Sequence, residues 1–119
     1  MEKTKQLVRL ACKALEDKKA EDIRVIDIHQ VSVMADYFII ANGTNTSQVQ
    51  AMSDGVEEAL EKQGLSPKQI EGYRGAGWIL LDYGDIIVHV FSKEDRLFYD
   101  LERIWRDGIA VDPASLSST

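Results

Sequence analysis

The segment from Trp78 to Phe91 constrains the fold most strongly, because it contains two β-rich runs joined by Gly84-Asp85. A glycine at the first of two turn positions favours a type II′ turn, whose twist matches that of antiparallel strands. Centring the register on this turn predicts which residues lie opposite each other and on which face. One face then consists of apolar and aromatic pairs: Tyr83 with Ile86, Leu81 with Val88, and Ile79 with Val90.

The second face of the predicted hairpin is mixed in character. It consists of three further pairs: Asp82 with Ile87, Leu80 with His89, and Trp78 with Phe91. This face is too apolar for a solvated surface and too polar for an ordinary core. It is therefore either covered by another element or offered to a partner, and the register alone leaves both alternatives open.

The rest of the chain has clear helix and strand periods. Apolar residues at helical spacing predict helices at 3–19, 46–63 and 93–106, and Gly64 is the expected stop of the second. Runs rich in β-branched residues predict strands at 22–28 and 37–41. Pro67 and three glycines predict a loop over 65–77.

This order of elements indicates an α/β (α+β) fold. We expect a mixed sheet of four strands with the helices mainly on one face. A single domain is expected over residues 1–107. The Pro- and Ser-containing segment 108–119 lacks apolar bulk and is expected to be a flexible C-terminal tail.

Composition narrows the class of function. The 119 residues carry a formal net charge of −6, which argues against non-specific binding to nucleic acid and is compatible with a basic protein partner. Cys12 is the only cysteine, so no internal disulfide and no cysteine-based zinc site can form. The sequence shows neither a membrane-spanning stretch nor a signal-peptide pattern, and we expect a cytoplasmic protein.

Two motifs could form a ligand site, one for phosphate and one for a metal ion, but both are better explained as parts of the local backbone structure. The run 42–47, which includes Gly43-Thr44, could present backbone N–H groups to a phosphate, but it lacks the lysine and paired glycines of a P-loop and is better suited to capping a helix. Asp82 and Asp85 could suggest a metal-binding pair. They are three residues apart with Asp85 in the turn, so their carboxylates are not expected to converge on a metal ion.

His89 is the histidine with the most suggestive setting. The hairpin register places it opposite Leu80, with Trp78 and Asp82 diagonal to it. The pattern places no serine, cysteine or lysine beside it, which a nucleophile–base pair would require. We therefore interpret His89 as a structural or interface residue, and we expect no catalytic, cofactor-binding or metal-binding residues in the chain.

Several blocks of the sequence resemble the ribosomal silencing factor family, also called Iojap-like proteins, over roughly residues 4–107. The matching blocks are Ala35-Asp36-Tyr37-Phe38, Gly43-Thr44 leading to Gln48-Val49 and Ala51, Glu71-Gly72, Trp78 to Asp82-Tyr83-Gly84-Asp85, His89-Val90-Phe91, and Arg96, Tyr99, Leu101, Glu102 and Trp105. The last three blocks, at their spacing, are specific. Asn42-Gly43-Thr44-Asn45 departs slightly from the Ser-Gly-Thr-Ser type run of the family.

The resemblance implies a nucleotidyltransferase-like fold without catalytic residues. It implies binding to the large ribosomal subunit through ribosomal protein L-fourteen, obstruction of small-subunit joining, and repression of translation under nutrient limitation, as in stationary phase. We also expect no cofactor, no membrane association and no direct specific binding to nucleic acid. The alternatives are a nucleotidyltransferase-like enzyme or phosphate-ligand binder, and an assembly protein that forms a homodimer.

The hairpin register and the resemblance together predict a partner-binding surface. Its expected residues are Trp78, Leu80, Asp82, His89, Phe91, Arg96, Tyr99 and Leu101. Trp78 and Tyr99 are the expected hot spots, because aromatic residues dominate binding energy at protein interfaces.

Overall fold

The computed structural model describes residues 2–28, 35–75, 77–92 and 109–111, with no description of the side chains of 2, 3 and 109–111. Its elements, in chain order, are α1 (Glu2–Asp17), β1 (Glu21–Asp27), β2 (Tyr37–Gly43), α2 (Thr46–Glu61), β3 (Gln69–Glu71), β4 (Trp78–Asp82), β5 (Ile86–Ser92) and β6 (Ile109–Val111). The predicted helix 93–106 lies outside the described residues.

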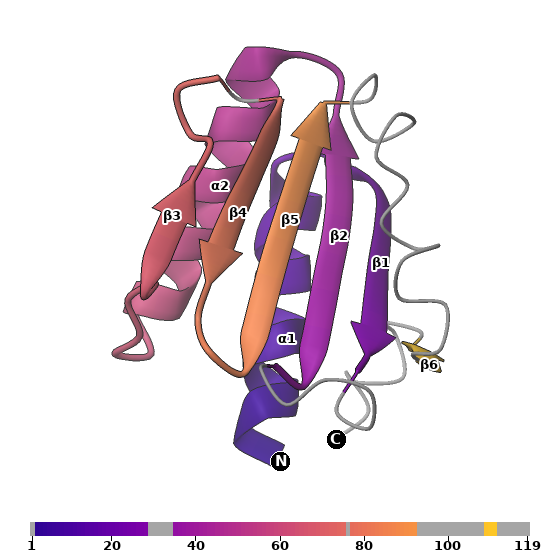
Figure 1. Ribbon diagram of the computed structural model, residues 1–119, viewed down its shortest axis with the longest axis vertical. Coiled ribbons are helices and arrows are strands. Elements are labelled where there is room, and N and C mark those ends of the chain that lie inside the picture. The colour runs from indigo at the N-terminus through magenta and orange to yellow at the C-terminus, as the bar shows by residue number, and fades with distance from the viewer. Residues whose placement is uncertain (1, 29–34, 76, 93–108, 112–119) are drawn as a thin grey trace.

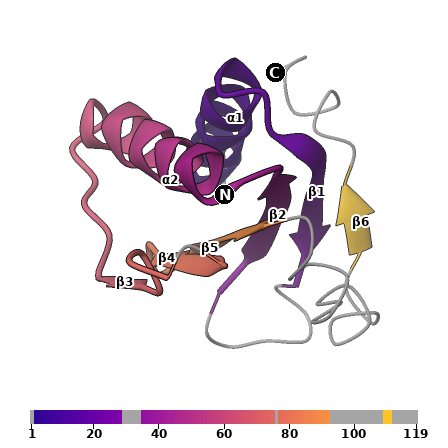
Figure 2. The ribbon, with the colours of Figure 1, turned by 90° about the horizontal axis from the view of Figure 1, so that it is seen from above.

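The described strands form one mixed sheet in the order β3-β4-β5-β2-β1-β6 (Figure 1). The central pair, β2 and β5, is parallel, and the remaining neighbours are antiparallel. Both helices lie on the same face of the sheet (Figure 2). The predicted α+β class, with a mixed sheet and helices on one face, is therefore confirmed.

The hairpin has the predicted register. Trp78 lies opposite Phe91 and Leu80 opposite His89, and the Tyr83 N–H donates to the Ile86 carbonyl at 2.9 Å. Of the two turn residues only Gly84 has a positive φ, of +89°, as a type II′ turn requires at its first position.

The segment before α2 is a helix cap, as predicted. The Asn45 side chain accepts a hydrogen bond from the Gln48 N–H at 2.8 Å. The Gln48 side chain in turn accepts from the Thr44 N–H at 2.7 Å and donates to the carbonyls of Lys18 and Lys19 at 3.1 and 2.9 Å. This network joins the start of α2 to the segment that follows α1.

The end of α2 is also as predicted. Gly64 has a φ of +80°, and the Leu65 N–H donates to the Leu60 carbonyl at 3.1 Å. This bond spans five residues, which identifies a Schellman motif closing the helix.

Two strands lie where the sequence predicted none. β3 lies in the segment expected to be a loop, and its exposed residues Gln69, Ile70 and Glu71 are too few to show a strand period. β6 lies in the segment expected to be a flexible tail, where Ala110 pairs with Ile26 of β1. Both expectations were wrong at these residues, because the backbone of a neighbouring strand, and not local sequence, determines such short pairings.

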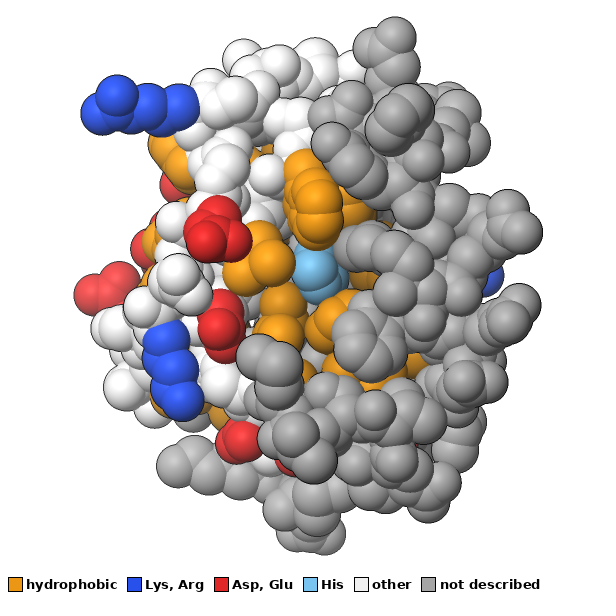
Figure 3. Space-filling view, viewed as in Figure 1, with side chains coloured by type: hydrophobic (Ala, Val, Ile, Leu, Met, Phe, Trp, Pro, Cys, Tyr) orange, Lys and Arg blue, Asp and Glu red, His pale blue; other side chains and the backbone are white. Residues whose placement is uncertain are grey.

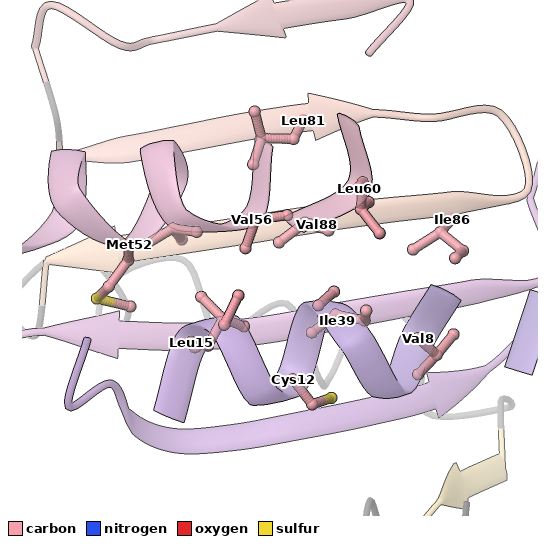
Figure 4. Packing of buried hydrophobic residues seen from close by; sticks show 14 of the residues in the cluster. Val8, Cys12, Leu15, Ile39, Met52, Val56, Leu60, Leu81, Ile86 and Val88 are labelled. Carbon is pink, nitrogen blue, oxygen red and sulfur yellow. The ribbon is translucent and has the colours of Figure 1, made fainter. Parts of the chain in front are cut away.

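The sheet carries a core on each face. The main core lies between the helices and the sheet (Figure 4), and its labelled members are Val8, Cys12, Leu15, Ile39, Met52, Val56, Leu60, Leu81, Ile86 and Val88. The second core lies on the other face and consists of Ile26, Ile28, Ala35, Phe38, Ile40 and Phe91, with Trp78 and Ile87 packed against it. Every residue of β2 is buried, because β2 contributes to both cores.

No helix in the described ranges is both long and apolar enough to cross a bilayer.

Candidate partner-binding surface

Trp78, the first residue of β4, is the anchor of the candidate surface. Its indole is partly exposed and stacks on the Phe91 ring with centroids 5.3 Å apart and planes at 22°. Its Nε1–H donates a hydrogen bond to Nδ1 of His89 at 3.0 Å. The indole is thus held from beneath by one ring and from the side by another.

His89 is almost fully buried, with 3% of its surface exposed. The Phe38 and His89 rings pack in a T-shaped arrangement with a centroid distance of 4.6 Å. Since the indole N–H can only donate, Nδ1 of His89 is the unprotonated nitrogen and the ring proton is on Nε2. Burial lowers the His89 pKa from 6.5 to about 4, so the imidazole is neutral at pH 7.

Leu80 lies beside Trp78 on the same face and is partly exposed. A hollow of about 250 Å³ is lined by Glu71 of β3, by Gly72, and by Trp78 and Leu80 of β4. Gly72 has a φ of +80°, and a Cβ there would collide with the Trp78 carbonyl oxygen. We call Trp78, Leu80 and this hollow the Trp78 surface.

Acidic groups border the Trp78 surface. Figure 3 shows apolar side chains gathered around the pale-blue histidine, with acidic side chains on the β3 side of them. Glu71 is exposed, and Asp82 is half-buried with its carboxylate accepting a hydrogen bond from the Gly84 N–H at 2.8 Å. A positively charged partner would meet favourable charge along this edge.

The two carboxylates near the turn, those of Asp82 and Asp85, have different surroundings. Asp82 closes the turn through its bond to Gly84, and Asp85 is exposed in the turn itself. Within the described ranges, no group of three or more His, Cys, Asp or Glu side chains is placed to hold a metal ion.

The predicted surface residues fall into three groups. Trp78, Leu80 and Asp82 are at least partly accessible. His89 and Phe91 were expected to contribute to an open surface, but they are buried and support Trp78 from within the sheet. Arg96, Tyr99 and Leu101 lie outside the described residues.

Two residues of this region, Phe38 and Glu71, were not among the predicted surface residues. Phe38 packs against His89 because β2 lies beside β5, a pairing between segments far apart in the chain that no local pattern reveals. Glu71 borders the hollow because β3 pairs with β4. The adjacent Gly72 was a usable signal, since glycine is common where two backbone segments approach closely.

A second hollow, of about 270 Å³, lies between the two helices. Small residues such as Ala14 and Gly55 line it, together with side chains of both charges, including Lys13 and Glu58. This mixture selects neither an anionic nor a cationic ligand, so the Trp78 surface is the stronger candidate.

The chain is similar to proteins of one family. The family model described as "Ribosomal silencing factor during starvation" matches residues 1–119. The protein named ribosomal silencing factor RsfS from Bacillus subtilis is 40% identical over 108 residues, which cover 91% of this chain and 92% of that protein. The chloroplastic protein Iojap of Zea mays is 32% identical over 84% of this chain and 43% of its own length. The family model and the Bacillus subtilis protein are both named for ribosomal silencing, a regulatory role and not an enzymatic reaction.

Solved structures give the same result. A crystal structure from Bacillus halodurans superposes with a TM-score of 0.81 at 38% identity, covering 90% of this chain and 97% of that one. A crystal structure from Chromobacterium violaceum has a TM-score of 0.82 at 34% identity, covering 84% and 83% of the two chains. Since sequence, family model and fold agree over most of its length, the chain belongs to the ribosomal silencing factor family.

Proposed function

We propose that this protein represses translation by binding the large ribosomal subunit through ribosomal protein L-fourteen and thereby blocking the joining of the small subunit under nutrient limitation. In this proposal it acts in the cytoplasm by occupying a surface and catalyses no reaction. Family membership supports the ribosomal target. The observation that carries the proposal for this chain is the partly exposed Trp78, held by Phe91 and His89.

The Trp78 surface has the properties of a binding hot spot. Tryptophan is among the residues that contribute most to binding, and its contribution is largest where neighbours exclude water. The stack on Phe91 and the hydrogen bond to His89 fix the indole before binding, which reduces the entropy lost on association. Leu80 extends the apolar area beside it.

The charge of the protein supports a basic partner. The net charge is −6, and Glu71 and Asp82 lie at the edge of the Trp78 surface. Opposite charges at the rim of an interface accelerate association and favour the correct orientation. A ribosomal protein that binds RNA is a partner of this kind.

The same surface could also join two copies of the chain. The homodimer and the ribosome complex would then compete for Trp78, because one indole cannot be covered twice. Sedimentation of the free protein at several concentrations, with and without large subunits, separates the two states.

The direct experiment is co-sedimentation of the purified protein with separated ribosomal subunits. We expect retention on the large subunit and not on the small one. Trp78→Ala should weaken binding by about 2 kcal/mol or more, which is about 30-fold, because it removes the proposed hot spot. Binding is measured by titrating the protein against a fixed subunit concentration.

The matched control is Ile70→Ala. Ile70 is an exposed apolar residue, with 37% of its surface accessible, but it pairs with Leu81 and so lies on the helix side of the sheet. It should bind like the parent. A Trp78→Ala variant that melts cooperatively and still binds like the parent would show that the surface is misassigned.

A further inference from the structure

We propose that His89 is a positioning residue for binding: its imidazole holds the Trp78 indole in the one orientation that the partner meets. This inference rests on the function proposed above. It assigns a buried side chain, which touches no partner, a measurable effect on the complex.

The geometry of the hairpin makes His89 the natural acceptor. Trp78 lies directly opposite Phe91, and His89 lies opposite Leu80, so His89 is the diagonal neighbour of Trp78 on the same face. Diagonal pairs are within reach of large aromatic side chains. The Nε1–Nδ1 distance of 3.0 Å is that of an ordinary hydrogen bond.

Stacking alone would not fix the indole. An aromatic stack tolerates sliding and turning of one ring over the other, since offset arrangements have similar energies. The bond from Nε1 to His89 selects one edge of the indole and directs it inward, toward β5. The opposite edge of the indole is thereby directed away from His89 and the strand that carries it.

The acceptor is held in place by its surroundings. His89 is 3% exposed, the Phe38 ring packs against it with centroids 4.6 Å apart, and β5 lies between β4 and β2 within the sheet. Because the Trp78 indole is hydrogen-bonded to this buried imidazole, its orientation is restricted as well.

Without its bond to Trp78, a histidine at position 89 would destabilise the folded protein. Nε2 of His89 is buried and has no hydrogen-bond partner among the residues that the structure describes. A phenylalanine could fill the same space without burying an unpaired donor, and burying one costs free energy. The bond to Trp78 is the compensating interaction that a phenylalanine could not make.

The test uses the indole N–H as a direct reporter. The chain has two tryptophans, so Trp105→Phe leaves Trp78 as the single source of an indole signal in a ¹H–¹⁵N spectrum. In this background the Trp78 N–H should exchange slowly with water. His89→Phe, which keeps an aromatic ring and removes the acceptor, should accelerate exchange at least several-fold.

A second variant makes the test specific for the acceptor. His89→Asn can place an amide oxygen close to the position of Nδ1, so it should restore slow exchange in part. The control Ile87→Val changes packing on the same face of β5 without touching the acceptor, and should leave exchange as in the parent. If His89→Phe does not fold, the test is whether the Trp78 N–H exchanges faster in His89→Asn than in Ile87→Val.

The binding arm measures dissociation from purified large ribosomal subunits. His89→Phe should dissociate roughly 3- to 10-fold faster, because an unfixed side chain must be ordered on binding. His89→Asn should lie between His89→Phe and the parent.

The outcomes separate the two proposals. Unchanged indole exchange in folded His89→Phe, or changed exchange with unchanged dissociation, would overturn the positioning role while ribosome binding stands. Failure of the parent to bind large subunits would instead overturn the proposed function, whatever the exchange rates show.

Discussion

Burial favours the neutral forms of three titratable side chains in the described part of the chain, His89, Cys12 and Tyr83. It lowers the pKa of His89 to about 4 and raises the pKa of the Cys12 thiol to about 12, with the nearby Glu16 carboxylate contributing to the second shift. Burial also raises the pKa of the Tyr83 hydroxyl. At neutral pH none of the three side chains carries a charge into the core. Cys12 is accordingly expected to be inert, since the thiolate is the reactive species.

The His89 pKa predicts how stability depends on pH. The unfolded histidine takes up a proton near pH 6.5, while the folded one resists protonation down to about pH 4. Its contribution to stability is therefore complete above pH 6.5 and is lost as the pH falls toward 4. The difference between these pKa values corresponds to about 3 kcal/mol in the free energy of unfolding.

Urea unfolding of the parent and of His89→Asn across this range measures the effect. Carboxylates titrate in both proteins and cancel in the difference. The stability of the parent should fall further than that of the variant between pH 6.5 and 4. Parallel curves would mean that His89 is as easily protonated in the folded state as in the unfolded one.

At the scale of elements, α2 is defined by interactions at its two ends. Asn45 accepts a hydrogen bond from the first turn, and Gly64 takes the left-handed conformation after the last. Gln48 adds bonds to the carbonyls of Lys18 and Lys19. The helix is thus anchored at the point where it meets the chain leaving α1.

Asn45→Ala should lower the free energy of unfolding by about 1 kcal/mol, because the Gln48 N–H loses its side-chain acceptor. Ser47→Ala, an exposed neighbour in the first turn, should change stability by less than about 0.5 kcal/mol. Urea denaturation with an unchanged slope measures both. Equal effects of the two substitutions would show that the cap contributes nothing beyond helix propensity.

The elements that the sequence predicted correctly are those encoded by neighbouring residues. The Gly84-Asp85 turn and the Asn45 cap each act over a few positions, so their residue types suffice to identify them. The burial of His89 and Phe91 depends instead on β2, which lies beside β5 only because the chain crosses over between them. β3 has three exposed residues and therefore no hydrophobic period to detect. The sequence thus placed Trp78, Leu80, His89 and Phe91 on one face of the hairpin, but it did not distinguish the accessible residues from the buried ones.

At the scale of the whole molecule, charge and apolar surface have separate roles in the proposed complex. The net charge of −6 acts at a distance, whereas Trp78 and Leu80 act only on contact. In salt of 0.1 M the field of a charge extends about 10 Å, so it influences encounter more than the formed interface.

Association with large ribosomal subunits should therefore slow as salt rises from low to moderate concentration, while dissociation changes little. Glu71→Gln, at the edge of the Trp78 surface, should slow association more than Glu58→Gln, which is in the hollow between the helices. Stopped-flow or biosensor kinetics across a salt series measure both rates. A salt-independent association rate would show that the acidic character serves solubility and not the choice of partner.

The parallel pairing of β2 with β5 has a consequence for the synthesis of the protein. Tyr37 begins a strand buried on both faces, yet its neighbour Ile86 is translated 49 residues later. At about 5–20 residues per second, the nascent chain carries this apolar strand without its central partner for about 2–10 seconds. One edge of β2 is open to wrong pairings throughout that time. The parallel β2–β5 pair can form only when the hairpin has been made, so the segment that carries Trp78 also supplies the central partner of β2.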